Sequence, residues 1–553
     1  MIQAHDARAV RAAEDLLLAR GEPLMQRASW ALAGAVLREL RTARGAVRGA
    51  HVCLLVGSGN NGGDTLFAGA RLAGRGVRLS AVLLDDRVHR DGLAALRAAG
   101  GIVTHAAGRT FDDVARHVVE ADVVLDGILG IGASGGLRGL AGDVVRAVVR
   151  RLETAPRRPL VVAVDVPSGI GVDDGSLPRP DPARSGSRGA QQPGDPVVLR
   201  ADRTVTFGAA KPGLLLPPAA ALAGEVEVVD IGLGLDDDRT WHPGAVRRLA
   251  PQDLVDQGAL AAPTGTAHKY SRGVLGVVAG TEDFPGAAVL TVSGAVRTGV
   301  GMVRYLGDPS VTAAVLAARP EVVPAAGRVQ AWAVGPGLPA APAAPAAPAG
   351  QSGHSGNGDA ARSQRTRVRH ALAQATGELS SDVVGDAVPV VVDAGALPLL
   401  PDRCPPWVVL TPHAGELATL LRSRGDDVER SDVEAEPLRW ARRARDLTGA
   451  TVLLKGEVTV VVGPSGAYAQ ADGPSWLATA GAGDVLTGIL GSLLAARSED
   501  AVRDPGLPAL LAASAALLHG RAAHRANPGG PVSALDVAEA VPGTVAALLR
   551  GDL

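Results

Sequence analysis

The chain has 553 residues, which is long enough for two or more domains. Its formal net charge of −2, with no strongly basic block, argues against nucleic acid as a main partner. No apolar run reaches the roughly 18 residues of a membrane helix, and residues 1–6 lack the layout of a signal peptide. The only cysteines, Cys53 and Cys404, are far apart and lack metal-site spacing. We therefore expect a cytoplasmic protein with reduced cysteines and no membrane or nucleic-acid partner.

Lysine is rare in this chain. Of 55 basic residues only Lys211, Lys269 and Lys455 are lysines, so arginine supplies the ordinary surface cations. A retained lysine is therefore a candidate for a site that needs a compact ammonium, although chance survival under codon bias is an alternative. Asparagine is similarly scarce, and two of the few are the adjacent Asn60 and Asn61.

In chain order, residues 7–49 have the composition of helices, and residues 51–56 form a short apolar strand. A glycine-rich loop at 57–64 follows, and we expect the next helix to begin at about Thr65. Strand, glycine loop and helix together are typical of a phosphate cradle. The segment GNNGGD at 59–64 adds amide and carboxylate oxygens that a plain dinucleotide loop lacks.

Further apolar strands are predicted at 77–84, 121–125 and 160–164. The strand ends carry polar groups, since Asn61 and Asp64 follow the first strand, Asp126 the third, and Asp165 and Ser168 the fourth. Each Asp taken alone is equally well explained as a turn or helix cap. Because the carboxyl ends of parallel strands face one crevice, the set together predicts a site there.

The first half resembles the NAD(P)H-hydrate epimerase family over roughly residues 1–235. The resemblance lies in LMQRAS at 24–29, GNNGGD at 59–64, VLDGILGIG at 124–132, VDVPSG at 164–169 and ADRTVTFGAAKPG at 201–213. It implies an α/β fold, with a Rossmann-like three-layer domain at 1–238. The insert at 176–196 is rich in Pro, Arg, Gly and Ser, and we expect it to be a disordered surface excursion.

The resemblance also implies functional residues. It places K⁺ at Asn61, Asp126 and Ser168, whose oxygens suit a hard cation. Asp165 and Lys211 would be catalytic, with the proton donor left open and Lys211 paired either with phosphate or with Asp165. The implied hydrate-binding residues are Asn60, Asn61, Gly62, Gly63, Asp64, Gly130, Ile131, Gly132, Ala133, Ser134, Gly135, Gly136 and Asp165.

Residues 236–245 are polar and rich in turn formers, which predicts a domain boundary and a second domain at 243–553. We expect residues 339–365 to be a low-complexity loop. Strands are predicted at 274–279, 302–306, 331–334, 390–393, 407–410 and 451–454, with a closing apolar helix at 507–523.

The stretch LATAGAGDVLTG at 477–488 is the centre of the second half. Gly481 and Gly483 allow backbone N–H groups to point at a phosphate near a helix N-terminus. Asp484 would repel that phosphate, and a general base that takes a hydroxyl proton is an economical explanation for it. From these residues alone, an Asp that only caps the helix is an equally good explanation.

With HKYSRG, GPG, LTPHAGEL and LLKGE, this stretch resembles the ribokinase-like ADP/ATP-dependent NAD(P)H-hydrate dehydratases over about 243–553. The resemblance implies catalysis by Asp484, with ADP or ATP as co-substrate and Mg²⁺ as helper. His413 taken alone would more often be structural, and Pro339 and Gly395 depart from the family pattern. The implied hydrate-binding residues are Ala288, Gly337, His413 and Asp484, and the nucleotide-binding residues are Lys455, Gly456, Glu457, Val458, Thr459, Gly481 and Gly483.

The two halves together are similar to bifunctional NAD(P)H-hydrate repair enzymes. The resemblance implies epimerisation of the R and S hydrates NADHX and NADPHX, then nucleotide-dependent dehydration of the S form, by a homo-oligomer. Preferences for ADP or ATP, and for NAD or NADP, stay open. One alternative is a ribokinase-like small-molecule kinase fused to a nucleotide-binding regulatory domain, and another is a non-enzymatic module on an inactive epimerase fold.

Overall fold

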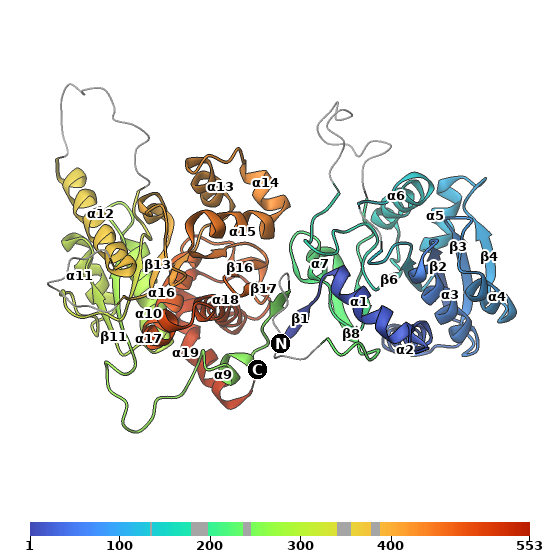
Figure 1. The fold of residues 1–553 in the computed structure, drawn as a ribbon, viewed down its shortest axis with the longest axis horizontal. Coiled ribbons are helices and arrows are strands. Elements are labelled where there is room, and N and C mark those ends of the chain that lie inside the picture. The colour runs from blue at the N-terminus through green and yellow to red at the C-terminus, as the bar shows by residue number, and fades with distance from the viewer. Residues whose placement is uncertain (133–134, 179–196, 236–244, 340–354, 378–386, 553) are drawn as a thin grey trace. The chain divides into compact units, whose positions relative to one another are not determined.

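The computed structural model describes residues 1–132, 135–178, 197–235, 245–339, 355–377 and 387–552 (Figure 1). Contacts divide the chain into two compact units, Gln3–Ala245 and Val246–Leu553, and the second also includes Met1–Ile2. Most of the predicted boundary and of the predicted insert at 176–196 lies outside the described residues.

The N-terminal unit is built on a parallel sheet of order β4-β3-β2-β5-β6-β7-β8. The order reverses between β2 and β5, as in doubly wound folds, and a ligand crevice lies at such a point. The strands are β2 (His51–Val56), β3 (Arg78–Leu83), β4 (Ile102–His105), β5 (Val123–Gly127), β6 (Leu160–Val164), β7 (Arg203–Phe207) and β8 (Glu225–Val229). The helices are α1 (Ala7–Leu18), α2 (Leu24–Arg44), α3 (Asn60–Ala73), α4 (Arg90–Ala98), α5 (Phe111–Val119), α6 (Gly139–Thr154), α7 (Pro212–Leu215) and α8 (Ala220–Ala223).

Strand β2 shows why this sheet is covered on both faces. Successive side chains of a strand point to opposite faces. Val52 and Leu54 enter a core shared with α2 and α3, whereas Cys53 and Leu55 enter a second core shared with α5 and α6. All four side chains are fully buried. The predicted Rossmann-like three-layer domain is therefore confirmed.

Two predictions about this unit were wrong in detail. Helix α3 begins at Asn60 and not at about Thr65, so the GNNGGD segment supplies its N-cap and first five residues. The glycines permit this because a Cβ on Gly62 would lie 2.3 Å from the carbonyl oxygen of Gly57. Strand β4 was not predicted, since it is short and partly exposed at the sheet edge and its apolar signal is correspondingly weak.

The C-terminal unit has a mixed sheet of order β1-β9-β17-β16-β15-β14-β13-β12-β10-β11. Pairings from β11 to β15 are parallel, and those of β15 with β16 and of β16 with β17 are antiparallel. The strands are β1 (Ile2–Ala4), β9 (Val246–Arg248), β10 (Val274–Val278), β11 (Met302–Tyr305), β12 (Ala331–Val334), β13 (Val390–Val392), β14 (Val408–Leu410), β15 (Thr451–Leu454), β16 (Thr459–Gly463) and β17 (Gly466–Gln470). The helices are α9 (Asp253–Asp256), α10 (Pro285–Thr298), α11 (Pro309–Ala318), α12 (Ser355–Thr376), α13 (Ala414–Ser423), α14 (Arg430–Ala435), α15 (Pro437–Thr448), α16 (Ala482–Ala496), α17 (Ser498–Arg503), α18 (Leu507–Ala526) and α19 (Ala534–Arg550), with 3₁₀ helices η2 (Ala394–Leu399) and η3 (Ser475–Leu477).

Helix α16 lies at the centre of this unit. It packs against α10, α18 and α19 and against β12, and Val485, Ile489 and Leu493 join the main apolar core. The α/β fold predicted for this half is confirmed. The predicted loop at 339–365 is partly wrong, because α12 begins at Ser355. Residues 340–354 of that loop lie outside the described part of the chain.

Among the described residues, no helix is long and apolar enough to cross a bilayer. Cys53 and Cys404 are both buried and unbridged. Burial raises the pKa of the Cys53 thiol to about 12, so this cysteine is an inert core residue.

Candidate active sites

The predicted cation ligands of the N-terminal unit meet at the reversal of strand order. Asp126 lies in β5, and Ser168 donates to it through both its backbone N–H (2.8 Å) and its Oγ (2.6 Å). Asn61 Nδ2 donates to the carbonyls of Leu129 (2.9 Å) and Val164 (2.6 Å). Ser168 Oγ also lies 3.4 Å from the Leu129 carbonyl oxygen. Asn61, Asp126 and Ser168 are thus brought together around one carbonyl.

The donor chemistry of this cluster fits a hard monovalent cation. It offers a carboxylate, a hydroxyl, backbone carbonyls and, after rotation of the Asn61 amide, an amide oxygen. Burial raises the pKa of Asp126, and hydrogen bonds from Ser168 and Ile128 oppose that rise. Within the described residues no group of three or more His, Cys, Asp or Glu side chains is placed to hold a metal. A site here would therefore combine the single Asp126 carboxylate with neutral oxygens.

Asp165 and Lys211 form a buried ion pair beside this cluster. Lys211 is 1% exposed, and its ammonium donates to Asp165 Oδ1, to Thr206 Oγ1 (2.9 Å) and to the Phe207 carbonyl (3.0 Å). The structure therefore pairs Lys211 with Asp165, the second of the two partners considered from sequence. Asp165 has a φ of 66°, a left-handed conformation that is unusual for a residue with a side chain. Such strain at the end of a strand is typical of functional positions.

Two further carboxyl groups face this pair. Asp64 is buried in α3, just after its first turn, and its Oδ1 has no hydrogen-bond partner among the described residues. Burial, Asp165 and Glu14 raise the pKa of Asp64 well above its ordinary value. Burial and Asp165 also raise the pKa of Glu14, which Lys211 opposes. Glu14 lies in a helix with no sequence motif around it, so sequence reasoning did not identify it.

The predicted phosphate segments frame the same crevice. Ser58, Gly59 and Asn60 are exposed at the open N-terminus of α3, a position that suits an anion. Gly130 lies against the Asn61 side chain, because a Cβ there would be 2.5 Å from Asn61 Oδ1. Ala133 and Ser134, in the middle of the second predicted segment, lie outside the described residues.

The start of helix α16 decides between the two interpretations of Asp484. Gly481, with a φ of 84°, is the N-cap, and no side chain caps the helix. Asp484 occupies the third helical position, so the interpretation of Asp484 as the N-cap is wrong. A Cβ on Gly483 would lie 3.3 Å from Lys455 Nζ, which places the ammonium directly beside the glycine backbone. An anion at this helix start would meet backbone N–H groups and an ammonium together.

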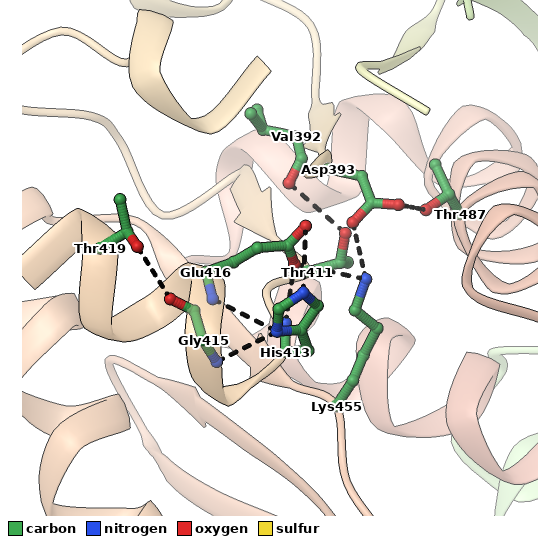
Figure 2. Close-up of polar contacts among 9 residues, drawn as sticks. All are labelled: Val392, Asp393, Thr411, His413, Gly415, Glu416, Thr419, Lys455 and Thr487. Carbon is green, nitrogen blue, oxygen red and sulfur yellow. Dashed lines mark hydrogen bonds and ion pairs between the residues drawn. The ribbon is translucent and has the colours of Figure 1, made fainter. Parts of the chain in front are cut away.

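Lys455 is held by two carboxylates, one directly after β13 and one on helix α13 (Figure 2). Its Nζ lies 2.8 Å from Asp393 Oδ1 and 3.8 Å from Glu416 Oε2. Burial alone would lower the Lys455 pKa, but Asp393, Glu416 and Asp484 together raise it. Lys455 is therefore a permanent cation at neutral pH.

Asp484 has an ionisation suited to a general base. Burial, followed by repulsion from Asp393, raises its pKa to about 7, and attraction to Lys455 opposes the rise. A base whose pKa lies near the working pH is ionised and still basic enough to accept a proton.

His413 has a structural role in the described fold. It is the N-cap of α13, and its Nδ1 accepts from the backbone N–H groups of Gly415 (3.0 Å) and Glu416 (3.3 Å). The Glu416 carboxylate in turn accepts from the His413 backbone N–H (2.9 Å), which completes a capping box. The His413 side chain is 56% exposed, and its Nε2 lies 3.6 Å from Glu416 Oε1.

The other predicted positions of this unit fall into two groups. Ala288 and Gly337 both pack around Gly280, where a Cβ would be 2.7 Å from the Ala288 Cβ. The nucleotide segment from Gly456 to Thr459 follows Lys455 as the turn between β15 and β16. The departure at Gly395 has a steric cause, since a Cβ there would lie 2.1 Å from the Leu338 carbonyl oxygen. Pro339 is exposed at the end of a described segment.

The chain thus has two α/β units, each with its own candidate active site. One site holds a buried Asp–Lys pair, and the other holds a carboxylate and an ammonium at a glycine-rich helix start. Residues 21–213 match a family model described as "YjeF-related protein N-terminus", and residues 275–541 match one described as "NAD(P)H-hydrate dehydratase".

Curated relatives match nearly the whole chain or its N-terminal half. It is 40% identical to a bifunctional NAD(P)H-hydrate repair enzyme of Mycobacterium leprae, with 94% of each chain covered. It is 43% identical to an NAD(P)H-hydrate epimerase of Microbacterium testaceum over 48% of this chain and 92% of that one. A solved ADP/ATP-dependent NAD(P)H-hydrate dehydratase of Bacillus subtilis, co-crystallised with ATP/Mg²⁺, is 25% identical with a TM-score of 0.42, and the match covers 55% of this chain and 99% of that one. The chain belongs to the family of bifunctional NAD(P)H-hydrate repair enzymes, and both resemblances inferred from its motifs are confirmed.

Proposed function

We propose that the N-terminal unit interconverts the R and S hydrates of NADH and NADPH, and that the C-terminal unit dehydrates the S form at the expense of ADP or ATP. The observation that carries the proposal is the position of the Lys455 ammonium beside the Gly483 backbone, next to Asp484. The pKa of Asp484 is raised to about 7. This arrangement provides an anion site and a base within one helix turn, which is what phosphorylation of a hydroxyl requires.

In the dehydratase reaction, Asp484 accepts the proton of the ring hydroxyl as that oxygen attacks the terminal phosphoryl group. The backbone at Gly481–Gly483 and the Lys455 ammonium stabilise the charge that develops on the transferred group. Phosphate then leaves with the C–O bond electrons, and loss of a proton from the adjacent ring carbon restores the double bond. Mg²⁺ would accompany the nucleotide phosphates and neutralise part of their charge.

In the epimerase reaction, the hydroxyl departs from a ring carbon bonded to nitrogen, and water returns on the other face without a redox change. The Lys211 ammonium donates to the Asp165 carboxylate beside the crevice. These two residues are the proposed acid–base pair. K⁺ held by Asn61, Asp126 and Ser168 would supply a fixed positive charge near the hydrate's phosphates. We further propose that the chain acts in the cytoplasm and forms a homo-oligomer. Light scattering on the purified protein measures the oligomeric state.

The test is to incubate the chain with mixed NADH hydrate epimers, ADP and Mg²⁺, and to follow the absorbance of the reduced nicotinamide. Recovery of NADH from both epimers is expected, because the first unit feeds the R form to the second. Recovery of only the S fraction would refute the epimerase. A stable phosphorylated product without NADH would instead favour a small-molecule kinase.

A further inference from the structure

Asp393 is a buried acidic residue that the proposed reaction does not yet use. It directly follows β13 and is 2% exposed. Its Oδ1 accepts from Lys455 Nζ at 2.8 Å, and its Oδ2 accepts from Thr487 Oγ1 at 3.0 Å. Its backbone N–H is bonded to the Val334 carbonyl at 3.0 Å. The carboxylate is therefore fixed at both oxygens and through its main chain (Figure 2).

The two partners of Asp393 belong to the two elements that carry the dehydratase chemistry. Lys455 follows β15 and lies beside Gly483. Thr487 is on α16, three residues after Asp484, and residues three apart share a face of a helix. Figure 2 shows Lys455 and Thr487 approaching the Asp393 carboxylate from different elements. Asp393 thus connects the ammonium of the anion site to the helix face that carries the base.

Few charged groups act on Asp484. Asp393 and Lys455 act on Asp484 directly, and Glu416 acts on Lys455. The side chains that α10 and α19 bring to Gly481 are the apolar Leu290 and Ala534. Among the ionisable groups of the helices packed on α16, Arg297 pairs with Glu539, Asp536 accepts from Ser533, Arg521 pairs with Asp472, and His519 is buried in the core. Asp393 is therefore the acidic group with the strongest effect on the pKa of Asp484.

We propose that Asp393 is a positioning residue of the dehydratase reaction, which holds the Lys455 ammonium beside Gly483 and, through Thr487, fixes the face of α16 that carries Asp484. The proposal rests on the dehydratase function proposed above. The negative charge of Asp393 also opposes the ionisation of Asp484. The same residue therefore orients the Lys455 ammonium and keeps the Asp484 pKa raised.

The experiment compares Asp393→Asn, Thr487→Val and Thr487→Ser in the full chain. The control is Thr544→Val, which alters an equally buried helical threonine whose hydroxyl bonds to the Ala540 carbonyl of its own helix. Dehydration of the S hydrate of NADH is followed across pH, with KM for ADP and the melting temperature measured for each variant. Wild-type activity establishes the proposed function independently of every variant.

For Asp393→Asn we expect kcat/KM to fall by about 10²-fold, as for a misplaced catalytic group. The acid limb of the pH profile should move about one unit lower, because a like charge near Asp484 is removed. KM for ADP should rise, because Lys455 is no longer aimed at Gly483. Thr487→Val should lower kcat/KM without moving the acid limb lower, because the Asp393 charge is retained. Thr487→Ser should restore kcat/KM, and Thr544→Val should leave both kcat/KM and the acid limb unchanged.

An unmoved acid limb and an unchanged KM for ADP in Asp393→Asn would overturn the proposal. An equal effect of Thr544→Val would do the same, since loss of any buried hydroxyl would then suffice. If Asp393→Asn does not fold, the Thr487→Val and Thr487→Ser pair decides, because Ser keeps the hydroxyl that donates to Asp393 and Val does not. No dehydration by the wild type would refute the proposed function itself.

Discussion

Replacement of Asp484 by Asn should inactivate the dehydratase and stabilise the fold above neutral pH. The carboxyl pKa is raised from its ordinary 3.8 to about 7, so the folded protein prefers the protonated form. That preference stabilises the fold at acid pH, and the stabilisation is lost as the pH rises from about 4 to 7. The difference corresponds to roughly 4 kcal/mol, which solvent screening of a partly exposed group reduces to about 2 kcal/mol.

Asn does not titrate, so Asp484→Asn removes this cost. We expect a melting temperature about 5 °C above wild type at pH 8 and no gain at pH 4. Turnover should fall by about 10²-fold or more, since the base is lost. Nucleotide affinity should hold or improve, because a negative charge beside the phosphates is removed. For the wild type, dehydration should weaken as the pH falls below about 7, because Asp484 must be ionised to act.

The assay combines thermal melts at both pH values with the recovery of NADH from its S hydrate. Asp536→Asn is the matched control, because Asp536 occupies the same third position of α19 but is bonded to Ser533 in a capping box. Those hydrogen bonds lower the Asp536 pKa, so this variant should lose a little stability above acid pH and keep normal turnover. Normal turnover in Asp484→Asn would refute its role as the base, and a pH-independent melting difference would refute the electrostatic argument.

Three more predictions concern the N-terminal unit and the division of the chain. Asp126→Ala should lower epimerisation and abolish any rise in melting temperature with K⁺, whereas an unchanged K⁺ response would exclude the ion from this cluster. Lys211→Met should abolish epimerisation and destabilise the unit by roughly 3–5 kcal/mol, because it leaves the buried Asp165 charge unpaired. Adding Asp165→Asn to this variant should restore the melting temperature but not the activity. If the melting temperature is not restored, the loss is one of packing and not of charge. Separate chains 1–245 and 246–553 should each fold and keep one activity, and insolubility of both would contradict independent domains.

Sequence reasoning located the strand ends well because short apolar runs followed by polar residues mark them directly. Asp126 and Asp165 were found in this way, whereas Asp484 was found from the glycine-rich stretch at the start of a helix. It could not find Asp393 as a partner of Lys455 and Thr487, because those three residues meet only through the order of strands in the sheet. The start of α3 was misplaced for a related reason, since glycine and asparagine are read locally as loop formers.

The role of Gly395 illustrates a second limit. From the sequence it is a departure from a family pattern, with no indication of whether the change matters. In the fold, the backbone of Leu338 passes so close that a side chain at 395 would collide with it. Close approach of two distant segments leaves no trace in local composition, and only the packed chain reveals it.

The scarcity of lysine gives this protein an unusual chemical reactivity. An amine-directed reagent meets three side chains: Lys269 is exposed, Lys455 is 22% exposed, and Lys211 is 1% exposed. Acylation should therefore proceed in that order. Since Lys455 lies beside Gly483, a nucleotide bound there would shield it while Lys269 continued to react. The ratio of label at these two positions would then report occupancy of one active site, with the other lysine as an internal standard within the same molecule.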